Sequence, residues 1–122
     1  MSQEHTTEAA PHLSSVDWFN YQRRSTHQIK VGSLTLGGDA PLRIQSMTTA
    51  DTMDIEKTVA ESERMIDAGC ELVRITAPSK KEAEALKTIA AALHEKGHDV
   101  PLVADIHFTP NAAMIAADVV EK

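Results

Sequence analysis

The fold of this chain is decided by the stretch PLVADIHF, residues 101–108, which starts as an apolar strand and ends in polar residues. A strand projects alternate side chains to opposite faces, so Asp105 and His107 are expected to share a face with Val103. Pro110 follows at a position where a helix would start. An apolar strand with a polar tip followed by a helix is typical of α/β proteins, whose ligands bind at such tips.

Two similar strand-and-helix units precede this stretch. Residues 42–47 and 71–76 are predicted strands, and each is followed by a predicted helix with an apolar face. The first helix spans about 54–68, and the second opens at Ser79 and stops at Gly97. The three strands begin about thirty residues apart, the length of a βαβ unit, which makes them parallel with right-handed crossovers.

A β-hairpin is predicted ahead of these units, over residues 28–38, because Gly32-Ser33 stands as a two-residue turn between alternating apolar residues. Three parallel strands buried on both faces are a poor stopping place for a sheet. We therefore expect an α/β fold, the N-terminal β-hairpin plus the first three βα units of a TIM (β/α)8 barrel, incomplete in this chain. A doubly wound sheet is the alternative. A TIM barrel typically needs ~250 residues, and the chain has 122.

The chain is predicted to divide into a tail and one domain. Residues 1–20 are polar and lack a periodic pattern, so they are expected to form a flexible N-terminal tail. Residues 21–122 are expected to form the N-terminal portion of a TIM-barrel domain. Three aromatic residues, Trp18, Phe19 and Tyr21, are expected to anchor the tail on that domain.

The composition argues against several classes of protein. Hydrophobic residues make up 42% and charged residues 25%, as in soluble globular proteins. The formal net charge of -6 argues against a nucleic-acid surface, which needs a basic stripe. No apolar run approaches a membrane span and no secretion signal is evident, so a cytoplasmic protein is expected. The single cysteine, Cys70, excludes an internal disulfide and a multi-cysteine metal site in this chain.

Arg74 is the most unusual residue of the second predicted strand, because it stands among Leu72, Val73 and Ile75. A guanidinium cannot be neutralised, so in a buried strand it needs a carboxylate or an anionic ligand. Two interpretations are open at this point. One is an ion pair with Asp105 on the neighbouring strand, and the other is binding of a ligand phosphate.

Asp105 and His107 at the third tip also allow several roles. They fit an oriented acid/base pair, polar contacts to a ligand, two metal ligands, or a structural hydrogen-bond network. Zinc sites usually need three or more protein ligands, so Asp-x-His alone is a weak metal signal. At the tip of the first strand, Ser46 and Thr48 either contact a ligand or cap the loop that follows.

Five motifs occur in this chain in one order: GGDAP at 37–41, IQSMT at 44–48, DAG at 67–69, LVRI at 72–75 and PLVADIHF at 101–108. In this order and spacing they closely resemble the N-terminal part of the 4-hydroxy-3-methylbut-2-enyl diphosphate synthase family. Members of this family are iron–sulfur oxidoreductases of the non-mevalonate pathway of isoprenoid (terpenoid) biosynthesis. The resemblance runs from about residue 21 to residue 122.

The resemblance implies an N-terminal TIM barrel and a C-terminal domain that holds a [4Fe-4S] cluster on three cysteines and a glutamate, a ligand set that this chain lacks. It also implies reductive ring opening of 2-C-methyl-D-erythritol 2,4-cyclodiphosphate, with ferredoxin or flavodoxin as electron donor, and a homodimer at full length. No catalytic residue and no metal ligand are assigned in this chain, and the chain alone is expected to be inactive. Matched by motif, the implied substrate-binding residues are Arg74 at the diphosphate and, nearby, Asp105, His107, Gln45, Ser46, Met47 and Thr48.

Two other functions stay open on the sequence. A different phosphate- or pterin-binding TIM barrel, similar to dihydropteroate synthase, would bind its ligand at the same strand tips. A non-catalytic truncated fragment would lack a cooperative unfolding transition, because its strand edges would be unpaired.

Overall fold

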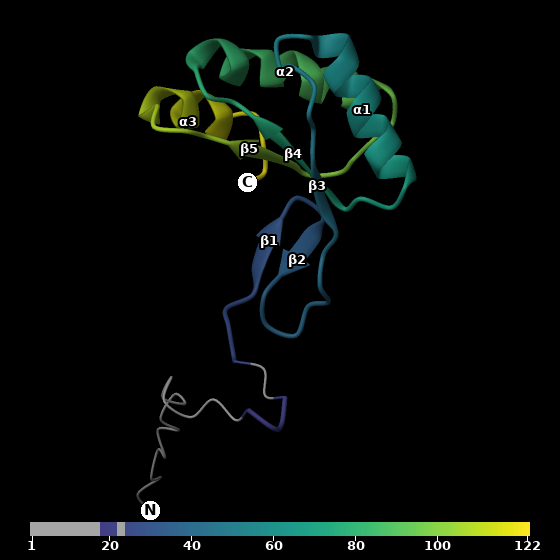
Figure 1. Ribbon diagram of the computed structural model, residues 1–122, viewed down its shortest axis with the longest axis vertical. Helices are drawn as coiled ribbons and strands as arrows, with labels where there is room; N and C mark the ends of the chain where they lie inside the picture. Colours follow the sequence, from purple (N-terminus) through teal and green to yellow (C-terminus); the bar gives the residue numbers. More distant parts are fainter. Residues whose placement is uncertain (1–17, 22–23) are drawn as a thin grey trace, which may run out of the picture.

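The computed structural model describes residues 18–21 and 24–122, and it contains a two-stranded and a three-stranded sheet with three helices (Figure 1). The predicted alternation of strands and helices is confirmed. In chain order the elements are β1 (Ile29–Val31), β2 (Leu34–Leu36), β3 (Gln45–Met47), α1 (Ile55–Asp67), β4 (Leu72–Thr76), α2 (Lys80–Glu95), β5 (Leu102–Asp105) and α3 (Pro110–Ala117).

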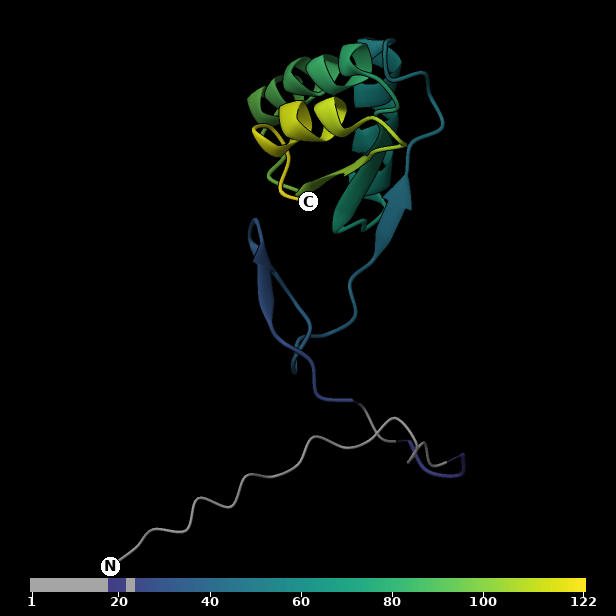
Figure 2. The same ribbon diagram turned by 90° about the vertical axis from the view of Figure 1, so that its left-hand side faces the viewer.

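The three-stranded sheet is parallel throughout, with the order β3-β4-β5. The helices lie on one side of this sheet, and the antiparallel β1-β2 hairpin lies on the other side (Figures 1 and 2). The helices share one side because each new strand is added next to the preceding one and βαβ crossovers are right-handed. The parallel sheet stays open in the described part of the chain.

The helices begin and end where their capping residues predict. The Asp54 side chain accepts a hydrogen bond from the Lys57 backbone N–H at 3.2 Å, and Gly69, with φ +104°, follows the last turn of α1. At α2 the N-cap residue is Ser79, and its hydroxyl donates to the Glu82 carboxylate instead of accepting from the backbone. None of these helices, within the described residues, has both the length and the apolar character needed to cross a membrane.

The first and third strands of the parallel sheet are shorter than predicted. β3 starts at Gln45, because its partner β4 starts at Leu72, the residue with which Gln45 pairs. β5 ends at Asp105, which pairs with Thr76, the last residue of β4. Apolar alternation indicates which residues can form a strand, but a strand extends only as far as its neighbour does.

Apolar side chains pack on both faces of the parallel sheet. Between the sheet and the helices, Val73, Ile75, Leu86 and Ile89 are each 0% exposed and form the centre of the core. On the other face, Val31 of the hairpin packs against apolar residues of the sheet, with Leu34 and Leu36 beside it; the buried sheet residues are Leu72 and Val103. The hairpin therefore covers the N-terminal half of that face and leaves the C-terminal half uncovered.

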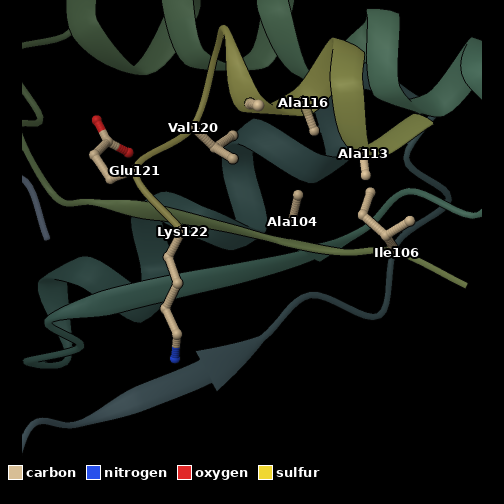
Figure 3. Close-up of a pocket in the computed structure, with 8 residues that line it drawn as sticks. Ala104, Ile106, Ala113, Ala116, Val120, Glu121 and Lys122 are labelled. Atoms are coloured by element: carbon tan, nitrogen blue, oxygen red, sulfur yellow. The ribbon is translucent and has the colours of Figure 1, made fainter. Parts of the chain in front are cut away.

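The edge of β5 that faces away from β4 pairs with the backbone of residue 122. The Ala104 N–H donates to the Lys122 carbonyl at 2.9 Å, and the Lys122 N–H donates to the Leu102 carbonyl at 3.3 Å, which is a parallel pairing pattern. A largely apolar groove of about 330 Å³ lies between this edge and α3. Figure 3 shows small side chains along it, among them Ala113 and Ala116.

The prediction that the three aromatic residues anchor the tail is wrong. Trp18, Phe19 and Tyr21 are 88%, 94% and 90% exposed. The apolar part of the sheet face opposite the helices is packed against the hairpin and not against these aromatic residues. The rest of the predicted tail, residues 1–17, lies outside the described residues.

We predict that Leu86→Ala lowers the free energy of unfolding by about 2–5 kcal/mol, because Leu86 is fully buried and its truncation leaves a cavity. Chemical denaturation followed by circular dichroism measures the change. Leu42→Ala is the matched control, since Leu42 is 91% exposed and its truncation should change the free energy by no more than about 0.5 kcal/mol. Equal losses in the two variants would contradict the described core.

Candidate functional site

Polar side chains gather where β3, β4 and β5 end, on the sheet face that the helices do not cover. Arg74 pairs with Val103 and alternates with Val73 and Ile75, whose side chains are buried under the helices. Arg74 therefore lies on the same face as Leu72, but one step closer to the C-terminal end of β4. We call this region the polar edge and define it by Met47, Arg74, Asp105 and His107.

An ion pair between neighbouring strands forms the centre of the polar edge. Arg74 Nη2 lies 3.0 Å from Asp105 Oδ1. The Asp105 side chain is only 12% exposed, whereas the Arg74 side chain is 40% exposed, and Arg74 Nε is buried without a hydrogen-bond partner. The predicted ion pair is therefore present, and it leaves part of the five-donor guanidinium group open to an approaching anion.

His107 shares the same carboxylate oxygen. Its Nε2 lies 3.2 Å from Asp105 Oδ1, and its side chain is 50% exposed. The hydrogen bond from Arg74 is the main cause that lowers the pKa of Asp105, and His107 lowers it further against the opposing effect of burial. Asp105 is therefore ionised at neutral pH, and it holds both Arg74 and His107 in place. His107 lies outside the strand, because β5 ends at Asp105.

The residues predicted at the tip of the first strand occupy different positions. Gln45 pairs with Leu72 and Met47 pairs with Arg74, so both lie on the face of the polar edge, and Met47 is 41% exposed. Ser46 pairs with Val73 and therefore lies on the opposite face. Thr48 is buried, and its N–H donates to the Arg74 carbonyl at 2.9 Å. Of these residues, Met47 is the one that the structure brings directly beside Arg74.

Metal-binding geometry is not found in the described residues, where no three His, Cys, Asp or Glu side chains converge. Cys70 lies just before β4, at the end of that strand away from the polar edge. It is buried, and its thiol donates to the Leu72 carbonyl at 2.8 Å. This cysteine is a small packed side chain.

Two features near the polar edge were not predicted from the sequence. Glu61 of α1 accepts hydrogen bonds from Thr49 and Ala50 in the loop that follows β3. Phe108 follows His107 with a φ of 51°, a left-handed conformation that is uncommon for an aromatic residue, and its side chain is fully exposed. The Glu61 contacts span eleven to twelve residues, so no local spacing rule would have indicated them.

Comparison with known proteins assigns the chain to a family. The family model described as the GcpE TIM-barrel domain matches residues 26–122. The chain belongs to this family. A relative from Phocaeicola vulgatus, named 4-hydroxy-3-methylbut-2-en-1-yl diphosphate synthase (flavodoxin), is 50% identical over 107 residues, which cover 88% of this chain and 17% of the relative. Relatives of the same name from Chlorobaculum tepidum and Leptospira interrogans are 48% and 49% identical over 104 residues; these cover 85% of this chain in both cases and 14% and 16% of the relatives.

The match covers most of this chain but only a small part of each relative. The chain spans about a sixth of the length of the curated relatives that it matches. The matched residues include every strand and helix of the described fold, and they include all four residues of the polar edge.

In this GcpE domain we predict that Arg74→Gln raises the pKa of Asp105 toward its ordinary value of 3.8. The guanidinium stabilises the ionised carboxylate, and the neutral amide of glutamine does so far less. A carbon-13 NMR titration of the Asp105 carboxyl group measures the shift. Arg64→Gln, on the exposed surface of α1, is the control and should leave this pKa unchanged.

The same pair predicts a pH dependence of stability. Because the pKa of Asp105 is lower in the folded than in the unfolded chain, the pair stabilises the fold above about pH 3.8, and this contribution is lost as the pH falls through the lower, folded-state pKa. The free energy of unfolding of Asp105→Asn should therefore fall less steeply over that acidic range than that of the unsubstituted chain. Parallel curves for the two proteins would contradict the role of the ion pair.

Proposed function

We propose that this GcpE domain supplies part of the substrate-binding barrel of a 4-hydroxy-3-methylbut-2-enyl diphosphate synthase. The reaction is the reductive ring opening of 2-C-methyl-D-erythritol 2,4-cyclodiphosphate, an oxidoreductase step of isoprenoid biosynthesis in the cytoplasm. Residues 21–122 would then be the first three βα units of a (β/α)8 barrel with the hairpin at its N-terminal end. The observation that carries the proposal is Arg74, half-exposed at the C-terminal edge of a parallel sheet.

The residues of the polar edge suit a diphosphate. A guanidinium group binds phosphate oxygens through parallel, charge-assisted hydrogen bonds, and Arg74 has donors that Asp105 does not use. Asp105 fixes the arginine from its buried side, so that the open side faces the ligand. His107 stands beside this pair as a further donor, and Met47 offers an apolar contact to the carbon skeleton of the substrate.

The other residues implied by the family resemblance receive smaller roles. Gln45 lies on the same face as Arg74, one pleat closer to the hairpin, where its amide would face the interior of the barrel. Thr48 supports the backbone of Arg74 from the side. Ser46, on the opposite face, would contact the substrate only through its backbone.

The [4Fe-4S] cluster of the family does not fit the residues of this chain. The sequence has one cysteine, and Cys70 is buried at the wrong end of β4, with its thiol bound to a backbone carbonyl. Three cysteine ligands would have to come from outside these residues. The electron donor is proposed to be flavodoxin, the protein given in the names of the relatives, or ferredoxin, and the complete enzyme is proposed to be a homodimer.

We predict that Arg74→Ala raises the KM for the cyclodiphosphate. The test protein is a chimera in which residues 26–122 replace the matching segment of the Phocaeicola vulgatus relative. Hydrogen bonds to a charged group contribute about 1.5–3 kcal/mol, so KM should rise about 10- to 100-fold. The visible absorption of the cluster should stay intact. An Arg64→Ala chimera is the control, and an unchanged KM in Arg74→Ala would remove Arg74 from the diphosphate site.

The 122-residue chain by itself should neither assemble a cluster nor reduce the cyclodiphosphate. Anaerobic incubation with iron and sulfide, followed by desalting, should leave no cluster absorption in the visible spectrum and no more bound iron than in Cys70→Ser. Turnover by the purified chain with a reduced flavodoxin would contradict the division of roles proposed above.

A further inference from the structure

The loop between β3 and α1 is held from the side of the helix by one carboxylate. We call residues 48–53 the edge loop. The Thr49 N–H lies 3.0 Å from each carboxylate oxygen of Glu61, the Thr49 hydroxyl donates to Oε1 at 2.8 Å, and the Ala50 N–H donates to Oε2 at 2.9 Å. Partial burial opposes ionisation of Glu61, but these hydrogen bonds outweigh it and lower the pKa of the carboxyl group.

The edge loop is held on its other side by the backbone of β4. The Thr48 N–H donates to the Arg74 carbonyl at 2.9 Å, and the Thr52 hydroxyl donates to the Thr76 carbonyl at 2.6 Å. Both threonines are buried. β3 ends at Met47, which pairs with Arg74, so the edge loop replaces β3 as the neighbour of β4 directly beyond Arg74.

We propose that Glu61 is a positioning residue for Arg74, acting through the edge loop. The inference rests on the proposed function, since it concerns how Arg74 is presented to a diphosphate. Glu61 binds the two backbone N–H groups that directly follow Thr48, and Thr48 binds the carbonyl of Arg74 itself. Because the edge loop is fixed on both sides, it keeps the C-terminal end of the β3-β4 pairing rigid. A rigid support holds a binding side chain near its productive geometry.

Glu63 is a matched control that separates the positioning role of Glu61 from a purely structural role. It lies two residues further along α1 and is also paired, with Lys96 Nζ at 2.7 Å and His98 Nε2 at 3.1 Å. These contacts tie α1 to the residues that follow α2 and do not touch the edge loop. Truncation of either glutamate removes a fixed carboxylate from α1, but only truncation of Glu61 releases the edge loop.

The test compares Glu61→Ala, Glu61→Gln and Glu63→Ala in the chimera described above. We expect Glu61→Ala to raise the KM for the cyclodiphosphate about tenfold with kcat within about twofold, because the support of a binding group is lost and the reacting centre is not. Glu61→Gln retains one acceptor oxygen and should raise KM only about threefold. Glu63→Ala should lower the melting temperature and leave KM unchanged.

Equal KM values for Glu61→Ala and the unsubstituted chimera, or equal KM increases in Glu61→Ala and Glu63→Ala, would overturn the inference. If Glu61→Ala does not fold, Glu61→Gln decides: an unchanged KM overturns the inference and a raised KM supports it. An unsubstituted chimera without activity counts against the proposed function instead. In that case amide exchange of Ala50 in the 122-residue chain tests the hold on the loop, and exchange should be at least about tenfold faster in Glu61→Ala than in Glu63→Ala.

Discussion

β4 must bury one face completely and still carry a permanent positive charge on the other. Val73 and Ile75 are 0% exposed beneath the helices, and Arg74 stands between them on the opposite face. A guanidinium stays charged in any protein environment, so its position demands a carboxylate close by and access to water. Asp105 on β5 meets the first demand, and the uncovered C-terminal half of the face meets the second. The ion pair with Asp105 and the exposure of the polar edge both follow from this one residue.

The hairpin explains why polar side chains gather at only one end of the sheet face opposite the helices. Val31 buries the N-terminal part of the face, and the link from hairpin to sheet is fixed by Arg43. Arg43 Nε donates to the Thr35 carbonyl at 3.1 Å, and its Nη1 lies 3.7 Å from a Glu71 carboxylate oxygen. An apolar cover at the N-terminal end leaves Arg74 and His107 accessible to solvent at the C-terminal end of the face.

Local sequence signals predicted the helices and strands. Contacts between elements far apart in the sequence determined features that these local signals do not predict. The Gly32-Ser33 turn and the Asp54 cap identified the hairpin and α1, because turn and cap chemistry act within a few residues. The ion pair of Arg74 with Asp105 was one of two interpretations that the sequence left open, because a buried charge needs either a carboxylate or an anionic ligand. The ends of the strands and the Glu61 contacts depend on residues far apart in the sequence, so no local periodicity indicates them.

The charge balance at the polar edge limits what these residues can do by themselves. Arg74 and Asp105 together are neutral, and His107 adds a positive charge only when it is protonated. A diphosphate brings more than one negative charge into contact with a carboxylate that is ionised at neutral pH. Repulsion between the two anions offsets part of the attraction to the arginine, and the chain as a whole is acidic, with a net charge of -6. Under the proposed function, a tight diphosphate site at this edge would therefore need cations in addition to Arg74.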